Sequence, residues 1–239
     1  MRKTLLLCIF IIPVVFISCR SSANEPEIPC DAVVYFADPV LEYYIRAAVR
    51  KSDGRPICAS DCRNIQEIVI EGAAGGAQAI TKLDGIEALT GLKKLVIRHS
   101  QIFKIDPLEN MTSLVHIDFS HNYIRDITPL ENLTSLTYLD LQFQRNGIND
   151  TAPLAGLINL KYLNLSSNKL NRLSFVDPLF DLANLTGLER LYFAGNNYLP
   201  DGHPVTMPPL DLTSIAGLVN LRELQLSANK IENIGAIAG

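Results

Sequence analysis

Three side chains near the middle of the chain are of types that bind metal ions or move protons: His116, Asp118 and His121. Imidazole and carboxylate groups are ligands for transition metals, so a metal site is one interpretation of this trio. His116 and Asp118 are two residues apart, which places them on the same side of a strand. We expect His121, in the bend before Asn122, to face away. A flat strand surface also offers no enclosed pocket, so we predict neither a metal site nor catalysis here.

Other features of the sequence also argue against an enzyme. The chain contains no nucleophile elbow, phosphate-binding loop or HExxH motif. Its 21 basic and 25 acidic residues give a formal charge of −4, and no block of Lys or Arg stands out after residue 3. Nucleic-acid binding therefore has little support. We predict a protein without a cofactor, a resident metal or a nucleic-acid partner.

The strand that carries His116 and Asp118 belongs to a repeated unit. Residues 89–110 and 111–132 align with a period of 22 residues and no gap. A fixed period of this length indicates a solenoid, in which each unit buries its apolar face against the next. The strand pattern L-x-x-L-x-L begins seven times, at Ile65, Leu92, Leu114, Leu136, Leu160, Leu188 and Leu221. A polar slot after each strand from the second onwards is expected to hydrogen-bond neighbouring turns; we place it at Ser100, Asn122, Asn146, Asn168, Asn196 and Asn229.

The two residues that flank the middle apolar position of each strand are expected to point outward, because strand side chains alternate. Neighbouring strands lie about 4.8 Å apart, so these residues should form two continuous rows. Tyr and Arg are frequent anchors of protein interfaces, and both occur at the centre of the rows. We predict a protein-binding surface made of Lys94, His116, Asp118, Tyr138, Asp140, Tyr162, Asn164, Arg190 and Tyr192. The alternative is that every repeat must place some side chain here, without a functional role.

The repeats resemble the bacterial leucine-rich repeats of the 22-residue, internalin-like class. The pattern LxxLxxLxLxxNxIxDIxPLxx is matched most fully from Leu114 to Asn132, whereas the repeat lengths are uneven and Ala236 replaces the expected Pro. The resemblance implies an α/β solenoid of about seven repeats over residues 65–239, with a parallel sheet on its concave face. It also implies binding of a protein through that face, although members of the class bind diverse partners.

A different unit precedes the repeats, over residues 31–64. Asp38 followed by Pro39 is a helix start, and apolar residues continue at helical spacing from Leu41 to Val49. We expect Ser60 to begin a second short turn. A helical unit covers the apolar edge of a solenoid, so this segment is predicted to be the N-terminal cap.

The first residues have the organisation of an export signal. Two basic residues precede an apolar stretch of 14 residues, from Thr4 to Ile17. A bilayer-spanning helix needs about 20. The sequence Phe-Ile-Ser-Cys that ends at Cys19 resembles a bacterial lipobox. That resemblance implies a signal peptide over residues 1–18, lipidation of Cys19, and a polar tether up to residue 30. The alternative is ordinary signal cleavage nearby, with Cys19 incidental.

Export leads to a compartment in which disulfides form. Cys8 would leave with the signal peptide and Cys19 would carry lipid, which leaves an odd number of cysteines: Cys30, Cys58 and Cys62. We expect one disulfide, from Cys30 to either Cys58 or Cys62. Zinc binding is the alternative, but three cysteines without a nearby His do not complete a tetrahedral site.

Four turns carry extra residues, around 71–79, 142–145, 174–180 and 196–209. Insertions in a solenoid map to loops that often border a binding face. For the longest one, a binding role and neutral variation both remain open, and for the others we expect neutral variation. The chain stops at Gly239 without a polar capping unit. An uncapped end predicts self-association, a partner domain or a truncated gene product.

The sequence therefore predicts a lipid-anchored surface module that binds a protein through its concave sheet. The alternative is a structural or assembly subunit that docks through its C-terminal end. The protein is expected to be exported and anchored to a bacterial membrane. Arg20 follows Cys19 where some bacteria have an Asp retention signal, which favours the outer membrane or cell surface. The partner, from a host or from the same envelope, stays open.

Overall fold

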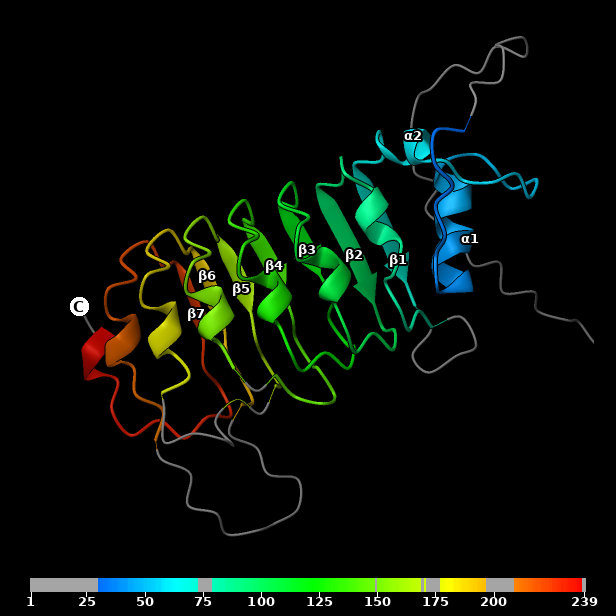
Figure 1. Ribbon diagram of the computed structural model, residues 1–239. Coiled ribbons are helices and arrows are strands. Elements are labelled where there is room, and N and C mark those ends of the chain that lie inside the picture. The colour runs from blue at the N-terminus through cyan, green and yellow to red at the C-terminus, as the bar shows by residue number, and fades with distance from the viewer. Residues whose placement is uncertain are drawn as a thin grey trace, which may run out of the picture.

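The computed structural model describes residues 30–72, 79–148, 150–168, 170, 177–196 and 209–237. Over these ranges the chain winds into a row of stacked coils. The strands form one wall of the row, and short helices form another (Figure 1). The predicted signal peptide, the lipidation site Cys19 and the tether up to residue 29 lie outside the described residues. Residues 73–78, 171–176 and 197–208, which include parts of three predicted insertions, also lie outside them.

The described residues contain two α-helices, α1 (Pro39–Ala48) and α2 (Ala59–Cys62), both before the first coil. The strands are β1 (Glu67–Glu71), β2 (Lys94–Arg98), β3 (His116–Asp118), β4 (Tyr138–Asp140), β5 (Tyr162–Asn164), β6 (Arg190–Tyr192) and β7 (Glu223–Gln225). The described 3-10 helices are η1 (Ile86–Ala88), η2 (Asp106–Leu108), η3 (Thr128–Leu130), η4 (Ala152–Leu154), η6 (Phe180–Leu182), η7 (Thr213–Ile215) and η8 (Gly235–Ile237).

Within the described residues the seven strands form one parallel sheet, in chain order from β1 to β7. The middle apolar residues of successive strands pair with one another, as Leu139 does with Leu163. Both are fully buried, because they point into the coil. This arrangement confirms the α/β solenoid and the seven strands that the repeat predicts.

A column of amide side chains, buried except for the half-buried Asn229, runs through the turns after the strands. Each carbonyl oxygen accepts a backbone N–H of the preceding coil, and each amide nitrogen donates to backbone carbonyls; the members are Asn122, Gln144, Asn168, Asn196 and Asn229. Our assignment of Asn146 to this column is wrong. The slot lies three residues after the last strand leucine, Leu141, and Gln144 fills it. The insertion follows that slot and displaces Asn146 to an exposed position.

The N-terminal cap covers the first coil as predicted. Asp38 is the N-cap of α1, and its Oδ1 accepts the N–H groups of Val40 and Leu41 at 2.9 and 3.2 Å. Its other oxygen accepts the backbone N–H and hydroxyl of Thr81 in the first coil, at 2.8 and 2.9 Å. Leu41 and Ile45 are fully buried against that coil. One carboxylate therefore starts the helix and also fastens it to the solenoid.

A glycine lets the cap approach the coil closely. Gly85 has φ of +100°, and a Cβ added there would lie 2.4 Å from the carbonyl oxygen of Tyr35. The neighbouring Asp84 carbonyl accepts the N–H of Ala37 at 3.2 Å. A larger residue at position 85 would both strain the backbone and push the cap away.

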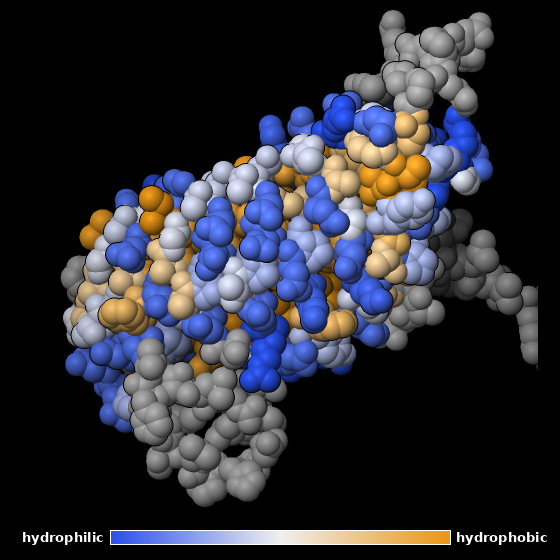
Figure 2. All heavy atoms as spheres, in the orientation of Figure 1, coloured by the Kyte–Doolittle hydropathy of each residue, from blue (hydrophilic) through white to orange (hydrophobic). Residues whose placement is uncertain are grey.

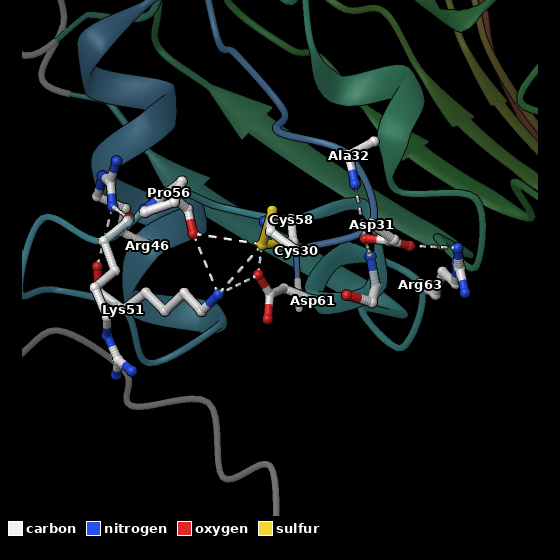
Figure 3. The surroundings of a disulfide bond; sticks show 11 residues. Cys30, Asp31, Ala32, Arg46, Lys51, Pro56, Cys58, Asp61 and Arg63 are labelled. Atoms are coloured by element: carbon white, nitrogen blue, oxygen red, sulfur yellow. Dashed lines mark hydrogen bonds and ion pairs between the residues drawn. A yellow bond between two sulfur atoms is a disulfide. The ribbon is translucent and has the colours of Figure 1, made fainter. Parts of the chain in front are cut away.

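The disulfide joins Cys30 to Cys58, whose Cα atoms lie 5.4 Å apart. Figure 3 shows it beside Lys51, whose ammonium lies 2.7 Å from a carboxylate oxygen of Asp61. The sequence left the choice between Cys58 and Cys62 open. Cys62 is a free, fully buried thiol, and burial together with the Asp61 charge raises its pKa to about 11. The second helix begins at residue 59 with Cys58 as its N-cap, two residues before Ser60, the cap that the sequence suggested.

The last described coil differs from the others in burial. Leu221, Leu224 and Leu226 are half-buried, whereas Leu191 and the other strand leucines of the central coils are fully buried. Val219 in this coil is 83% exposed. On the side of the molecule seen in Figure 2, most of the coils carry hydrophilic residues, and apolar residues gather near the cap and at the C-terminal coils.

Candidate binding face on the parallel sheet

The outward side chains of the seven described strands lie in two rows, in the register that the repeat predicts. The first row contains Glu67, Lys94, His116, Tyr138, Tyr162, Arg190 and Glu223. The second row contains Val69, Val96, Asp118, Asp140, Asn164, Tyr192 and Gln225. All nine predicted site residues belong to these rows, so the structure brings them together on one face. We call this surface the concave face.

Aromatic rings stack along the centre of the first row. The ring centroids of His116 and Tyr138 lie 3.9 Å apart with an interplanar angle of 5°, and those of Tyr138 and Tyr162 lie 4.2 Å apart at 7°. The guanidinium of Arg190 lies 5.5 Å from the centroid of Tyr162 and covers the end of this ring column. Tyr192, in the second row, is tilted by 41° to Tyr162. Stacking holds the rings in fixed positions, so little conformational entropy remains to be lost on binding.

His116 is neutral within this column at neutral pH. Burial, followed by the positive charge of Lys94, lowers the pKa of its imidazole below the usual value near 6.5. The ring therefore contributes as an aromatic surface, which agrees with its parallel stacking on Tyr138.

Ion pairs occupy the part of the concave face next to the cap. The Lys94 ammonium lies 2.6 Å from a Glu67 carboxylate oxygen, and the Arg98 guanidinium donates to Asp118 at 2.7 Å and to Glu71. Our prediction did not include Arg98. The signal was present, because Arg98 is two residues after Val96 and strand alternation places it on the same face.

Two neighbouring aspartates of the second row, Asp118 and Asp140, are almost fully buried. Asp118 has the Arg98 guanidinium as its counter-ion. Asp140 instead accepts hydrogen bonds from neutral groups: the Gln142 N–H at 2.9 Å, the Asn164 amide at 3.1 Å and the Tyr162 hydroxyl at 3.2 Å. Burial raises the pKa of Asp140, and the charge of Asp118 adds to this, despite the hydrogen bonds that favour the ionised form.

A second aromatic column follows the turns at the ends of the strands. His121 stacks on His99 with a centroid distance of 4.3 Å and lies 4.9 Å from Phe143. All three residues have positive φ, between 50° and 59°. Residue types alone did not predict this column, since it depends on a left-handed turn that repeats from coil to coil. The ring of His121 therefore packs between His99 and Phe143 in this column. No group of three or more His, Cys, Asp or Glu among the described residues is arranged to hold a metal ion.

An open hollow of about 600 Å³ lies outside the two rows, in the turns that follow β2, β3 and β4. Its lining includes Phe103, Arg125 and Asp126. The Asp126 carboxylate accepts the Thr128 N–H at 2.9 Å, and hydrogen bonds from Thr128 lower its pKa. Asp126 thus has a structural role in the turn before η3.

Family models match three parts of the chain. A model of two leucine-rich repeats matches residues 112–156, and single leucine-rich repeat models match residues 159–182 and 218–238. A crystal structure of internalin C2 from Listeria monocytogenes is 25% identical with a TM-score of 0.59. This match covers 85% of the present chain and 90% of internalin C2. The repeats and the fold are those of a leucine-rich repeat solenoid, similar to internalin C2. No curated protein sequence matches the chain.

Two further solved structures share the leucine-rich repeat fold and no more. The ectodomain of GASSHO1/SCHENGEN3 from Arabidopsis thaliana, in complex with CASPARIAN STRIP INTEGRITY FACTOR 2, is 20% identical with a TM-score of 0.51. The match covers 70% of the present chain and 19% of the ectodomain. The matched chain of the TLR13–ssRNA13 complex is 20% identical with a TM-score of 0.50. The match covers 72% of the present chain and 28% of that chain. Since one of these proteins is seen with a protein factor and the other with RNA, the fold alone does not select a class of ligand.

Among the described residues, no helix has the length and apolar character needed to cross a membrane.

Proposed function

We propose that this protein is a lipid-anchored surface module that binds a protein partner through its concave face. The observation that carries the proposal is the ring column of His116, Tyr138 and Tyr162, which Arg190 closes at one end. Tyr and Arg supply most of the energy in many protein interfaces. Here they are already held in place by stacking, so an approaching partner meets a rigid, amphipathic surface.

The charge of the protein favours a protein over a nucleic acid as the partner. The five carboxylates of the strands (Glu67, Glu71, Asp118, Asp140 and Glu223) outnumber the three basic side chains (Lys94, Arg98 and Arg190). Phosphate backbones are bound by surplus positive charge, and this face has none.

The test replaces Tyr138, Tyr162 and Tyr192 together by Ser and measures capture of partner proteins from cell-surface and host extracts. The expected result is loss of capture, with the fold verified by circular dichroism. A matched control replaces Tyr35 and Tyr43, which are 81% and 64% exposed on the cap. Undiminished capture by the triple variant, or equal loss in the control, would refute the assignment.

The lipid anchor is a separate part of the proposal and has its own test. Export followed by acylation of Cys19 would place the folded residues at a membrane surface, and several acyl chains give a lasting anchor. Membrane fractionation and mass spectrometry of the N-terminal peptide should find an acylated Cys19 in the wild type. Cys19→Ser should release the protein from the membrane. An unmodified N-terminus at a nearby residue would instead establish ordinary signal cleavage.

A structural or assembly role is the second candidate. It is favoured by the half-buried Leu221, Leu224 and Leu226 of the last described coil, together with the exposed Val219. Light scattering of the purified protein at rising concentration tests this role. A clean monomer throughout the range counts against end-on assembly.

A further inference from the structure

One amide group faces several acceptors at the centre of the concave face. The amide nitrogen of Asn164 lies within hydrogen-bond distance of three oxygens: 3.1 Å from Asp140 Oδ2, 3.2 Å from Gln142 Oε1 and 3.5 Å from Tyr162 Oη. An amide nitrogen carries two protons, so the three oxygens compete for them. We call Asp140, Gln142, Tyr162 and Asn164 the central cluster.

The central cluster also contains a negative charge without a counter-ion. Asp140 forms no ion pair with any described residue. Lys94 is engaged with Glu67, Arg98 with Asp118 and Glu71, and Arg190 lies over the Tyr162 ring. A buried carboxylate ordinarily has a positive partner.

The neighbouring coil shows what is missing at Asp140. Asp118 receives its cation from Arg98, which lies two residues beyond Val96, the strand partner of Asp118. The corresponding residue for Asp140 lies two residues beyond Asp118 and is Ser120. The same site in successive coils is thus filled by a guanidinium in one case and left without a charge in the next.

We propose that the central cluster recognises a basic side chain, lysine or arginine, of the protein partner. This inference rests on the proposed function and adds the chemistry of the ligand. An ammonium offers three donors and a guanidinium five, and neither has an acceptor. Either group would therefore add donors for these oxygens and a positive charge beside Asp140. A partner that excludes water from the face strengthens this attraction, since charges interact more strongly at low dielectric constant.

The test titrates short peptides into the purified full chain and follows the side-chain amide resonances of Asn164 and Gln142 by NMR. The probes are acetylated and amidated Gly-Gly-Arg-Gly-Gly, the same peptide with Lys, and the same peptide with neutral citrulline. We expect the Arg and Lys peptides to shift both resonances and the citrulline peptide to bind about tenfold more weakly or not at all. The stronger of the two basic peptides identifies the preferred head group.

A variant that carries its own cation beside Asp140 tests whether the basic peptides bind at the central cluster. Gln142→Lys places an ammonium within reach of Asp140, because Gln142 Oε1 and Asp140 Oδ2 share the Asn164 amide. Gln142→Met is the neutral control of similar length. Binding of the basic peptides, followed in both variants by the Asn164 amide, should be lost in Gln142→Lys and retained in Gln142→Met. Circular dichroism confirms that both variants fold.

Three results would overturn the inference: no shift with either basic peptide, equal shifts with citrulline, or unchanged binding to Gln142→Lys. None of them decides the proposed function. If the triple tyrosine variant still loses capture of a protein partner, the concave face remains the binding surface without a basic-residue site. If capture is undiminished, the proposed function itself fails.

Discussion

The N-terminal cap and the centre of the concave face each bury an aspartate, and the two carboxylates differ in their surroundings. Asp38 is 3% exposed and Asp140 is 6% exposed. Burial raises the pKa of Asp38, but hydrogen bonds from Thr81, Leu41 and Val40 outweigh it, so the pKa is lowered overall. Burial raises the pKa of Asp140, and its hydrogen bonds do not overcome that effect.

The difference separates a structural carboxylate from one available for recognition. Asp38 holds a helix to the solenoid, and its oxygens accept several hydrogen bonds from two parts of the chain. Asp140 also accepts hydrogen bonds from its own turn and from β5, but it lies beside another aspartate on the concave face. A protein tolerates an under-compensated buried charge at a site where a ligand completes it.

Asp38→Ala should have the largest effect on stability. It removes the helix N-cap and the link to Thr81 together, for an expected loss of about 3 kcal/mol in the free energy of unfolding. Urea unfolding followed by circular dichroism measures this loss. Asp53→Ala is the control, because Asp53 is half-exposed and pairs with Arg55 at the surface. Equal stability of the two variants would show that Asp38 does not fasten the cap.

Arg98→Met should cause the next largest loss in the free energy of unfolding. It leaves Asp118, whose side chain is 3% exposed, without its cation. Breaking a fully buried ion pair costs about 3–5 kcal/mol, but Arg98 is itself 37% exposed, so we expect about 1–2 kcal/mol. Lys94→Met breaks a pair in which both side chains are about 40% exposed and should cost at most about 1 kcal/mol. A Lys94→Met loss as large as that of Arg98→Met would contradict the distinction between paired and unpaired buried aspartates.

Tyr138→Leu tests the ring column alone. It keeps an apolar side chain but removes the stacking on His116 and Tyr162, for an expected loss of about 1 kcal/mol. Tyr35→Leu is the exposed control. Weaker capture of the partner with an intact fold would place the column in the interface. Unchanged capture would restrict Tyr138 to a structural role.

The smallest effect is the pH dependence, and its sign differs between the two aspartates. A raised pKa means that Asp140 contributes stability below the pKa of the unfolded chain, and that this contribution is lost as pH rises through the folded pKa. A lowered pKa means that Asp38 contributes stability above the unfolded pKa, which is lost as pH falls through the folded pKa. Relative to wild type, Asp140→Asn should therefore gain stability as pH rises and Asp38→Asn should lose it. Unfolding curves at a series of pH values measure this, and the same trend in both variants would disprove the comparison.

The sequence predicted the scaffold well because the repeat period determines which residues point inward. Once the 22-residue unit is aligned, strand alternation gives both outward rows, including the neighbours Tyr138 and Tyr162. The helix start at Asp38 and Pro39 was also predicted correctly, because these residue types favour a helix N-terminus.

The remaining features depend on geometry that residue types do not encode. Cys58 and Cys62 lie within one turn of each other, so only the direction of α2 decides which one meets Cys30. Gln144 fills an asparagine slot because its amide reaches the same carbonyls. The hydrogen bonds around Asp140 depend on side-chain positions that strand alternation does not give.

Site-specific photocross-linking on cells that express the full chain tests the central claim most directly. A benzophenone amino acid is introduced at position 192 on the concave face and, separately, at position 131, which is exposed beside η3. If the concave face binds a protein, position 192 yields one cross-linked partner and position 131 does not. A partner cross-linked only from position 131 would contradict the account.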